Sequence, residues 1–286
     1  MASDPATSLL QTFSYPSDNP QYLIKWTRLG PAGRTTAHLP SRNTLVLTAV
    51  GPLRSCPLKQ IQPAAEFASN GHLTKQAEIT AALFKHWGLS SPPHIVAHDN
   101  AGLVALRTIL QHGCIYKSLT LIDVVAVGPW GLPFFKLVAG NEGVFNAIPP
   151  RMFDGIVRSY IRDAAFKPLR KDDEDMLAEP WVSGDGCPGQ EGLVYVLKQA
   201  STRVSEDVEV QYHKVGESGL PVKIIWGKQD AWVPCDHATK LRDLIGGKSE
   251  VVLVEDAGHL IQLDQPERLM AEIVLFLTKV DEASRE

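Results

Sequence analysis

Short apolar runs alternate with longer segments of helical periodicity along most of this chain. Runs rich in branched residues predict strands at 44–50, 94–98, 118–127, 222–227 and 250–256, the last of them before a C-terminal helix. These runs are almost continuously apolar, which is typical of strands that helices bury on both faces. Because strands alternate with helices, the pattern predicts a mostly parallel sheet built from βαβ units.

A region of about a hundred residues between Ile122 and Val222 breaks this alternation. It carries little strand signal, and its apolar residues recur at helical spacing within 134–148, 150–164, 174–181 and 190–200. Helices inserted after a parallel strand cover the carboxyl edge of the sheet, where ligands of such sheets bind. We therefore expect a helical cap over the site.

The domain boundaries follow from this pattern. The first residues are rich in Ser, Pro and Asp, which favours a flexible arm. The expected division is a flexible N-terminal arm at 1–20, a core at 21–127 and 216–286, and a helical cap at 128–215.

Composition narrows the classes of partner. The 286 residues are 44% hydrophobic and 21% charged, with a formal charge of −4, and they contain no long run of like charges. This favours neither nucleic acid nor an anionic membrane as a partner. No apolar stretch is long enough to span a membrane, and the first residues lack the features of a secretory signal. We expect a cytoplasmic monomer or homodimer that acts on a small lipophilic organic substrate and water.

The sequence contains no motif that would predict a metal or cofactor site. Cys56, Cys114, Cys187 and Cys235 are widely spaced, so the prediction is free thiols rather than disulfides. The sequence contains no zinc-type cluster, calcium-binding loop or phosphate-binding glycine loop. The expected cofactor set is none, and the expected metal set is none.

The segment HIVAHDNAG at 94–102 predicts a strand, a sharp turn and then a helix. Ala97, Ala101 and Gly102 are small, as a strained turn between a closely packed strand and helix requires. Asp99 takes the position that such a turn presents to a pocket, and the N-terminus of the helix stabilises negative charge there. The alternative is that Asp99 only caps the helix.

Two later residues complete a catalytic set. Asp230 follows the strand at 222–227, and His259 follows the strand at 250–256. The chain thus carries a nucleophile, an acid and a histidine in this order, each just past a strand. The three residues together are better evidence for a catalytic triad than any one of them alone. Asp123 also follows a strand and is the alternative to Asp230 as the acid.

The motifs AHDNAG, LTLIDVVAVGPWG, IIWGKQDAWVP and EDAGHLIQLDQPERL together resemble the α/β-hydrolase superfamily from about Tyr22 to Leu277. Asp99 makes the chain similar to the branch with an aspartate nucleophile, which includes epoxide hydrolases and haloalkane and haloacetate dehalogenases. The resemblance implies an α/β-hydrolase fold, with a mostly parallel sheet and a helical cap inserted between two strands. It also implies an ester on Asp99, water activated by His259, and Asp230 orienting that histidine.

The choice of an aspartate indicates the class of electrophile. A carboxylate that attacks an acyl carbonyl gives a reactive anhydride, whereas attack on a saturated carbon gives a stable ester. We therefore expect epoxide opening, including epoxide opening or cyclisation in polyketide or other secondary-metabolite biosynthesis. The alternatives are a dehalogenase, a hydrolase or carbon–carbon lyase in which Asp99 is only a general base, and a non-catalytic ligand-binding member of the fold.

Departures from the family pattern affect the oxyanion and halide groups. The usual HG loop after the first of these strands is replaced by GPLRSCP, so the oxyanion role of Gly51 and its neighbours from Val50 to Leu53 stays open. Asn100 stands where haloalkane dehalogenases carry a halide-binding Trp, which weakens the expectation of halide chemistry. His98 is a further candidate for substrate contact, although buried support of the turn is its more common role.

Epoxide hydrolases use cap tyrosines to protonate the opening oxygen. Tyr160, Tyr195 and Tyr212 are the candidates here, and Trp130 and Trp181 are candidates for an apolar wall. The alternative for each aromatic residue is packing between cap helices.

Overall fold

Among the residues that the computed structural model describes, the central sheet has five parallel strands in the order β3-β4-β5-β6-β7. The structure describes residues 10–15, 22–27, 44–48, 72–128, 133–183, 189–198 and 203–285. The sheet strands are β3 (Thr44–Thr48), β4 (His94–His98), β5 (Ser118–Ile122), β6 (Val222–Gly227) and β7 (Glu250–Val254). All five lie within the predicted runs, and the predicted parallel sheet is confirmed.

Strand β5 is shorter than its apolar run at 118–127 predicts. It ends at Ile122, and Asp123 takes a φ of 44°. A positive φ turns the chain out of an extended strand. The apolar residues Val124 to Val127 are therefore buried outside the sheet.

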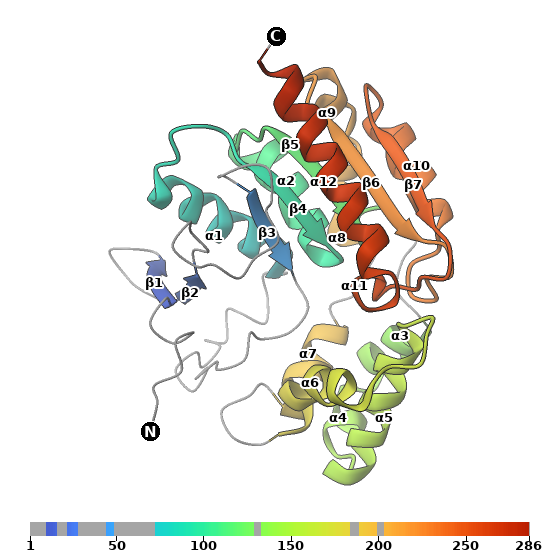
Figure 1. Cartoon of the computed structure of the whole chain (residues 1–286). Helices are drawn as coiled ribbons and strands as arrows, with labels where there is room; N and C mark the ends of the chain where they lie inside the picture. Colours follow the sequence, from blue (N-terminus) through green and yellow to red (C-terminus); the bar gives the residue numbers. More distant parts are fainter. Residues whose placement is uncertain are drawn as a thin grey trace, which may run out of the picture.

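Side chains alternate between the two faces of the sheet, as the pleat requires. Ile95 and Ala97 of β4 pack into the larger core with helix α2 (Asn100–His112), whereas Val96 packs against α12 (Pro266–Ala283). Helix α10 (Asp236–Ile245) shares the α2 face, and α1 (His72–Trp87) packs beside α2. Figure 1 shows α12 running across the opposite face.

A separate layer of helices lies beyond the carboxyl ends of the strands (Figure 1). They are α3 (Pro133–Gly140), α4 (Glu142–Asn146), α5 (Pro150–Asp163), α6 (Lys171–Val182) and α7 (Gly189–Lys198). Phe153, Val157 and Ile161 lie at helical spacing on α5 and pack with α7 in a core of their own. This layer is the predicted cap, although the helix expected at 134–148 breaks near Asn141.

The predicted cap boundary at residue 215 is too late. Helices α8 (Arg203–Glu209) and α9 (His213–Glu217) pack on the sheet core, because Val208 and Val215 join its apolar cluster. Among the described residues, the cap thus ends with α7.

The expectation of a flexible arm at 1–20 is wrong for part of that segment. Strand β1 (Leu10–Tyr15) pairs antiparallel with β2 (Tyr22–Thr27). Thr12, Phe13 and Tyr15 favour a paired strand. The rest of the arm lies outside the described residues. No helix in the described part of the chain is long and apolar enough to cross a membrane.

Candidate active site

Asp99 stands on a sharp turn between β4 and α2. Its φ of 55° and ψ of −132° are strained for a residue with a side chain, and such a conformation costs about 1–3 kcal/mol. The Asp99 N–H donates to Ile122 O at 3.2 Å, and the Asp99 carbonyl accepts from Gly102 N at 3.0 Å. A Cβ on Gly102 would lie 2.3 Å from Val124 Cγ1, so the small residue predicted here is required.

His259 lies between two carboxylates. Its Nδ1 is 2.9 Å from Asp230 Oδ2, and its Nε2 is 3.6 Å from Asp99 Oδ1. The other Asp230 oxygen, Oδ1, accepts from the N–H groups of Trp232 at 2.8 Å and Val233 at 2.9 Å. The structure therefore brings the three predicted residues together. Both carboxylate oxygens of Asp230 have hydrogen-bond partners, one in His259 and the other in the backbone.

Electrostatics fix the charges of this set. Burial alone would raise the pKa of Asp99, but the interactions with His259 and then His98 lower it below its usual value. Burial would lower the pKa of His259, but the hydrogen bond and charge of Asp230, with Asp99 next, raise it well above its usual value. Both shifts favour the charged forms, a carboxylate on Asp99 and an imidazolium on His259.

His98 and Asn100 flank Asp99 and support it. Burial, followed by the charge of His259, lowers the pKa of His98 to about 4, so this ring is neutral. Its Nε2–H donates to the carbonyl of His259 at 2.9 Å. Asn100 Nδ2 donates to Asp99 Oδ2 at 3.0 Å, which leaves Oδ1 toward His259.

Asp123, the alternative acid, does not bond to His259. Its Oδ1 accepts from Gly227 N at 2.7 Å, and its Oδ2 is buried without a hydrogen-bond partner among the described residues. Burial, and next the nearby charge of Asp230, raises the pKa of Asp123 well above its usual value. Of the two aspartates, Asp230 is therefore the one that bonds to His259.

Tyr160 of the cap reaches the catalytic residues through Trp232. The rings of Tyr160 and Trp232 stack with centroids 4.2 Å apart, and the Trp232 ring lies 5.0 Å from that of His259. Burial, and then the charge of Asp99, raises the pKa of Tyr160 well above its usual value. Tyr160 is therefore a protonated phenol close to Asp99.

Trp232 is a site residue that the sequence analysis did not single out. Its indole Nε1 is buried and has no hydrogen-bond partner in the described part of the chain. The available signal was an aromatic residue two positions after the acid, in QDAWVP. Phe134 and Phe135 pack against Tyr160 and extend the aromatic cluster into the cap.

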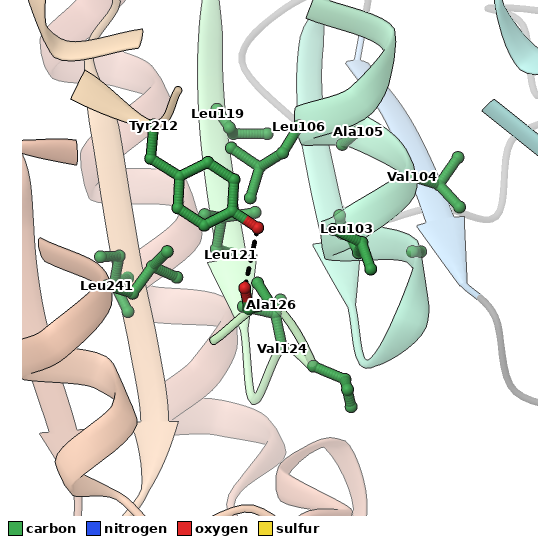
Figure 2. Close-up of a cluster of buried hydrophobic side chains, with 14 of the residues drawn as sticks. Leu103, Val104, Ala105, Leu106, Leu119, Leu121, Val124, Ala126, Tyr212 and Leu241 are labelled. Atoms are coloured by element: carbon green, nitrogen blue, oxygen red, sulfur yellow. Dashed lines mark hydrogen bonds between the residues drawn. The ribbon is translucent and has the colours of Figure 1, made fainter. Parts of the chain in front are cut away.

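The other candidates lie elsewhere. Tyr212 belongs to the sheet core, where its hydroxyl donates to Ala126 O at 2.8 Å, so the structure contradicts its prediction as a cap acid (Figure 2). Trp181 packs against the cap core, and Tyr195 lies beneath Lys198 Nζ at 5.2 Å. Gly51 and Trp130, with the whole segment from 49 to 71, fall outside the described residues.

A metal-binding group of three or more His, Cys, Asp or Glu side chains is not found among the described residues. The catalytic set itself pairs each carboxylate with a cation or with N–H donors.

Comparisons with known proteins identify the family of this chain. Residues 26–272 match the model of the alpha/beta hydrolase family. A solved alpha/beta hydrolase fold protein from Burkholderia ambifaria is 32% identical, with a TM-score of 0.62 over 70% of this chain and 72% of that chain. A curated relative, the dihydrolipoyllysine-residue acetyltransferase component of an acetoin cleaving system from Pseudomonas putida, is 24% identical over 90% of this chain and 67% of that protein.

A haloalkane dehalogenase from Bradyrhizobium elkani is also similar in fold. It is 14% identical, with a TM-score of 0.60 over 78% of this chain and 77% of that chain. Identity at this level indicates the fold alone. The predicted fold class is confirmed, and the chain belongs to the alpha/beta hydrolase family.

Proposed function

We propose that this protein hydrolyses a small lipophilic molecule at an electrophilic saturated carbon, an epoxide foremost, through an ester on Asp99. The observation that carries the proposal is a carboxylate at the turn where a hydroxyl would serve an esterase. That carboxylate has a lowered pKa and faces the catalytic histidine at 3.6 Å. A charged carboxylate is the nucleophile that forms a stable ester with such a carbon.

In the first step, Asp99 Oδ1 attacks a ring carbon and the carbon–oxygen bond of the epoxide breaks. The electron pair goes to the epoxide oxygen, which takes a proton from the Tyr160 hydroxyl. Tyr160 is the cap tyrosine that the stack on Trp232 holds closest to the catalytic set, which supports it as the acid. A protonated phenol can donate this proton to the oxygen as negative charge develops on it.

Proton transfer from His259 then prepares the second step. The ester has no negative charge, so the imidazolium loses one of its two carboxylate partners and its pKa falls. Its proton passes to the Tyr160 phenolate, which leaves a neutral His259. This base takes a proton from water, and the hydroxide adds to the ester carbonyl of Asp99. The bond from the carbonyl carbon to the substrate oxygen then breaks, and the alkoxide takes the proton of the added hydroxyl and leaves as the diol. Asp99 is again a carboxylate and His259 again carries a proton.

The aromatic cluster supports a lipophilic substrate. Phe134, Phe135, Tyr160 and Trp232 gather where the cap meets the sheet core. Aromatic walls of this kind bury apolar ligands. This setting suits an epoxide intermediate of secondary metabolism, such as a polyketide.

A haloalkane is the second candidate, and Trp232 favours it. Its buried indole N–H lacks a partner among the described residues, and an unpaired buried donor is costly unless a ligand accepts from it. A leaving halide is such an acceptor. Unlike an epoxide oxygen, a halide takes up no proton, so His259 would then have to lose its proton to solvent before hydrolysis.

Mass spectrometry of the intact His259→Gln protein tests the proposal. An aryl epoxide should add its whole mass to the protein, because the ester forms on Asp99 but water is no longer activated. A haloalkane should add only its alkyl group. The double variant Asp99→Asn/His259→Gln is the matched control and should carry neither adduct. An unmodified His259→Gln protein, under conditions where the wild type consumes the same epoxide, would contradict an ester intermediate.

A further inference from the structure

The carboxylate of Asp264 occupies a junction between the cap and the catalytic histidine. Asp264 ends the short helix α11 (Ile261–Asp264) and is 3% exposed. Its Oδ2 accepts from Gly258 N and from Phe166 N, both at 2.9 Å, and its Oδ1 accepts from Lys167 N at 2.8 Å. One carboxylate thus gathers backbone groups from the His259 loop and from the segment that follows cap helix α5.

Three consecutive residues of this loop are tied down. Gly258 N–H donates to Asp264, the His259 carbonyl accepts from His98, and Leu260 N–H donates to Ala164 O at 3.0 Å. The Leu260 bond leads to the segment after cap helix α5, the Gly258 bond reaches that segment through Asp264, and the His259 bond leads to the residue before Asp99. The main chain of His259 is therefore set by both layers of the molecule.

The two segments also touch at the level of their backbones. A Cβ on Gly258 would lie 2.8 Å from Ala164 O and 2.9 Å from Phe166 N. Real Cβ contacts are essentially never this short, so a larger residue would push the cap segment away from the histidine loop. The glycine in DAGHL is thus explained by the closeness of the cap segment.

We propose that Asp264 is a positioning residue that fastens the end of cap helix α5 to the His259 loop and thereby holds the imidazole between Asp230 and Asp99. The inference deepens the proposed function and rests on it for its kinetic consequence. Charge-assisted bonds from three N–H groups are stronger than neutral ones, which suits a fixed joint. When the joint loosens, hydrolysis of the ester should suffer before its formation, because His259 acts on the water.

The test compares Asp264→Asn with Asp281→Asn, a control on α12 at the other end of the sheet. An amide offers one acceptor oxygen in place of two, so at least one of the three N–H groups loses its acceptor. In a single turnover with an aryl epoxide, Asp264→Asn should slow ester hydrolysis roughly ten- to a hundredfold, with ester formation little changed. Asp281→Asn should leave both steps unchanged.

Titration of the histidine rings by nitrogen NMR gives a second readout that needs no substrate. The His259 signal is identified by its loss in His259→Gln. In Asp264→Asn its midpoint should move down by about one pH unit, because the ring leaves its place between two carboxylates. The same shift is expected of Gly258→Ala, because the added Cβ pushes the segment after α5 away from the His259 loop. This variant replaces Asp264→Asn in the test if Asp264→Asn does not fold.

The outcomes separate the two proposals. A wild-type His259 midpoint and a wild-type ester lifetime in a folded Asp264→Asn protein would overturn the role of Asp264. If no variant ever forms an ester, the proposed function fails, but the NMR midpoint still decides whether Asp264 positions His259.

Discussion

Two buried histidine–aspartate pairs lie at opposite ends of the sheet, and they differ in how strongly they hold a proton. At the carboxyl end, His259 bonds to Asp230 at 2.9 Å and its pKa is raised. At the amino end, His94 bonds to Asp281 at 3.0 Å and its pKa is lowered, mainly by burial. Both imidazoles are completely buried.

The neighbours of each pair explain the difference. His259 has a second carboxylate, Asp99, on its other nitrogen side. His94 instead meets the Ser118 hydroxyl at 2.7 Å, and Asp281 is shared with the cation of Lys117. One shared carboxylate does not offset burial, whereas two carboxylates do. The amino-end set contains the residue types of a serine triad, yet it only joins α12 to β4 and β5, so residue types alone do not identify a site.

The largest expected effect is at the nucleophile. Asp99→Asn removes the charge that attacks the substrate and should lower kcat by about 10⁴-fold or more. Steady-state turnover of the epoxide, with folding checked by circular dichroism, measures it. Turnover within tenfold of the wild type would show that Asp99 is not the nucleophile.

The two histidines should respond in opposite ways to the same change. His259→Gln should lower kcat by about 10³-fold or more, because general-base catalysis of ester hydrolysis is lost. His94→Gln should keep kcat and instead lower the free energy of unfolding by about 1–3 kcal/mol, since buried partners lose their bonds. Urea unfolding and turnover, measured on both variants, test the contrast. Loss of turnover in a stable His94→Gln protein would break the comparison.

The turn itself should be sensitive to a single methyl group. Gly102→Ala places a Cβ against Val124 and should destabilise the protein by about 1–3 kcal/mol through overpacking. In the double variant Gly102→Ala/Val124→Gly both clashing atoms, Val124 Cγ1 and Cβ, are absent, so the combined loss should be smaller than the sum of the two single losses. Thermal unfolding of the set measures it, and equal stability of Gly102→Ala and the wild type would count against the tight turn.

The smallest effect concerns pH at the amino end. The pKa of folded His94 lies below its unfolded value of 6.5, so the unfolded chain binds the proton more readily. Stability is therefore complete at higher pH and falls as pH drops below about 6.5, by at most about 1.4 kcal/mol per pH unit. Urea unfolding at neutral and at mildly acidic pH measures the free energy of unfolding. The decrease that comes from His94 should be seen in the wild type and should be absent in His94→Gln. Equal losses in both proteins would contradict a neutral His94.

The sequence predicts the features of the molecule that depend on a local pattern of residues. The five strands follow from continuous apolar runs, and Asp99, Asp230 and His259 stand out because each directly follows such a run. Helices α8 and α9 were placed in the cap because Val208 and Val215 show the same helical spacing whether they pack on the cap or on the sheet. Tertiary packing alone separates those cases.

The supporting residues of the site depend on contacts between distant segments. Three tyrosines fitted the acid role, and only the stack of Tyr160 on Trp232 distinguishes one of them. Asp264 binds backbone N–H groups almost a hundred residues away, and backbone groups leave no trace in residue types. Such joints are therefore visible only in the folded molecule.

A single turnover in heavy-oxygen water tests the central claim most directly. The wild-type enzyme is in molar excess over the epoxide, so that each active site reacts at most once. The peptide that carries Asp99 is then analysed by mass spectrometry. The ester mechanism predicts one heavy oxygen in Asp99 and none in the diol, because water adds to the ester carbonyl. Heavy oxygen in the diol and none in Asp99 would show that water attacks the substrate directly, and would contradict the ester.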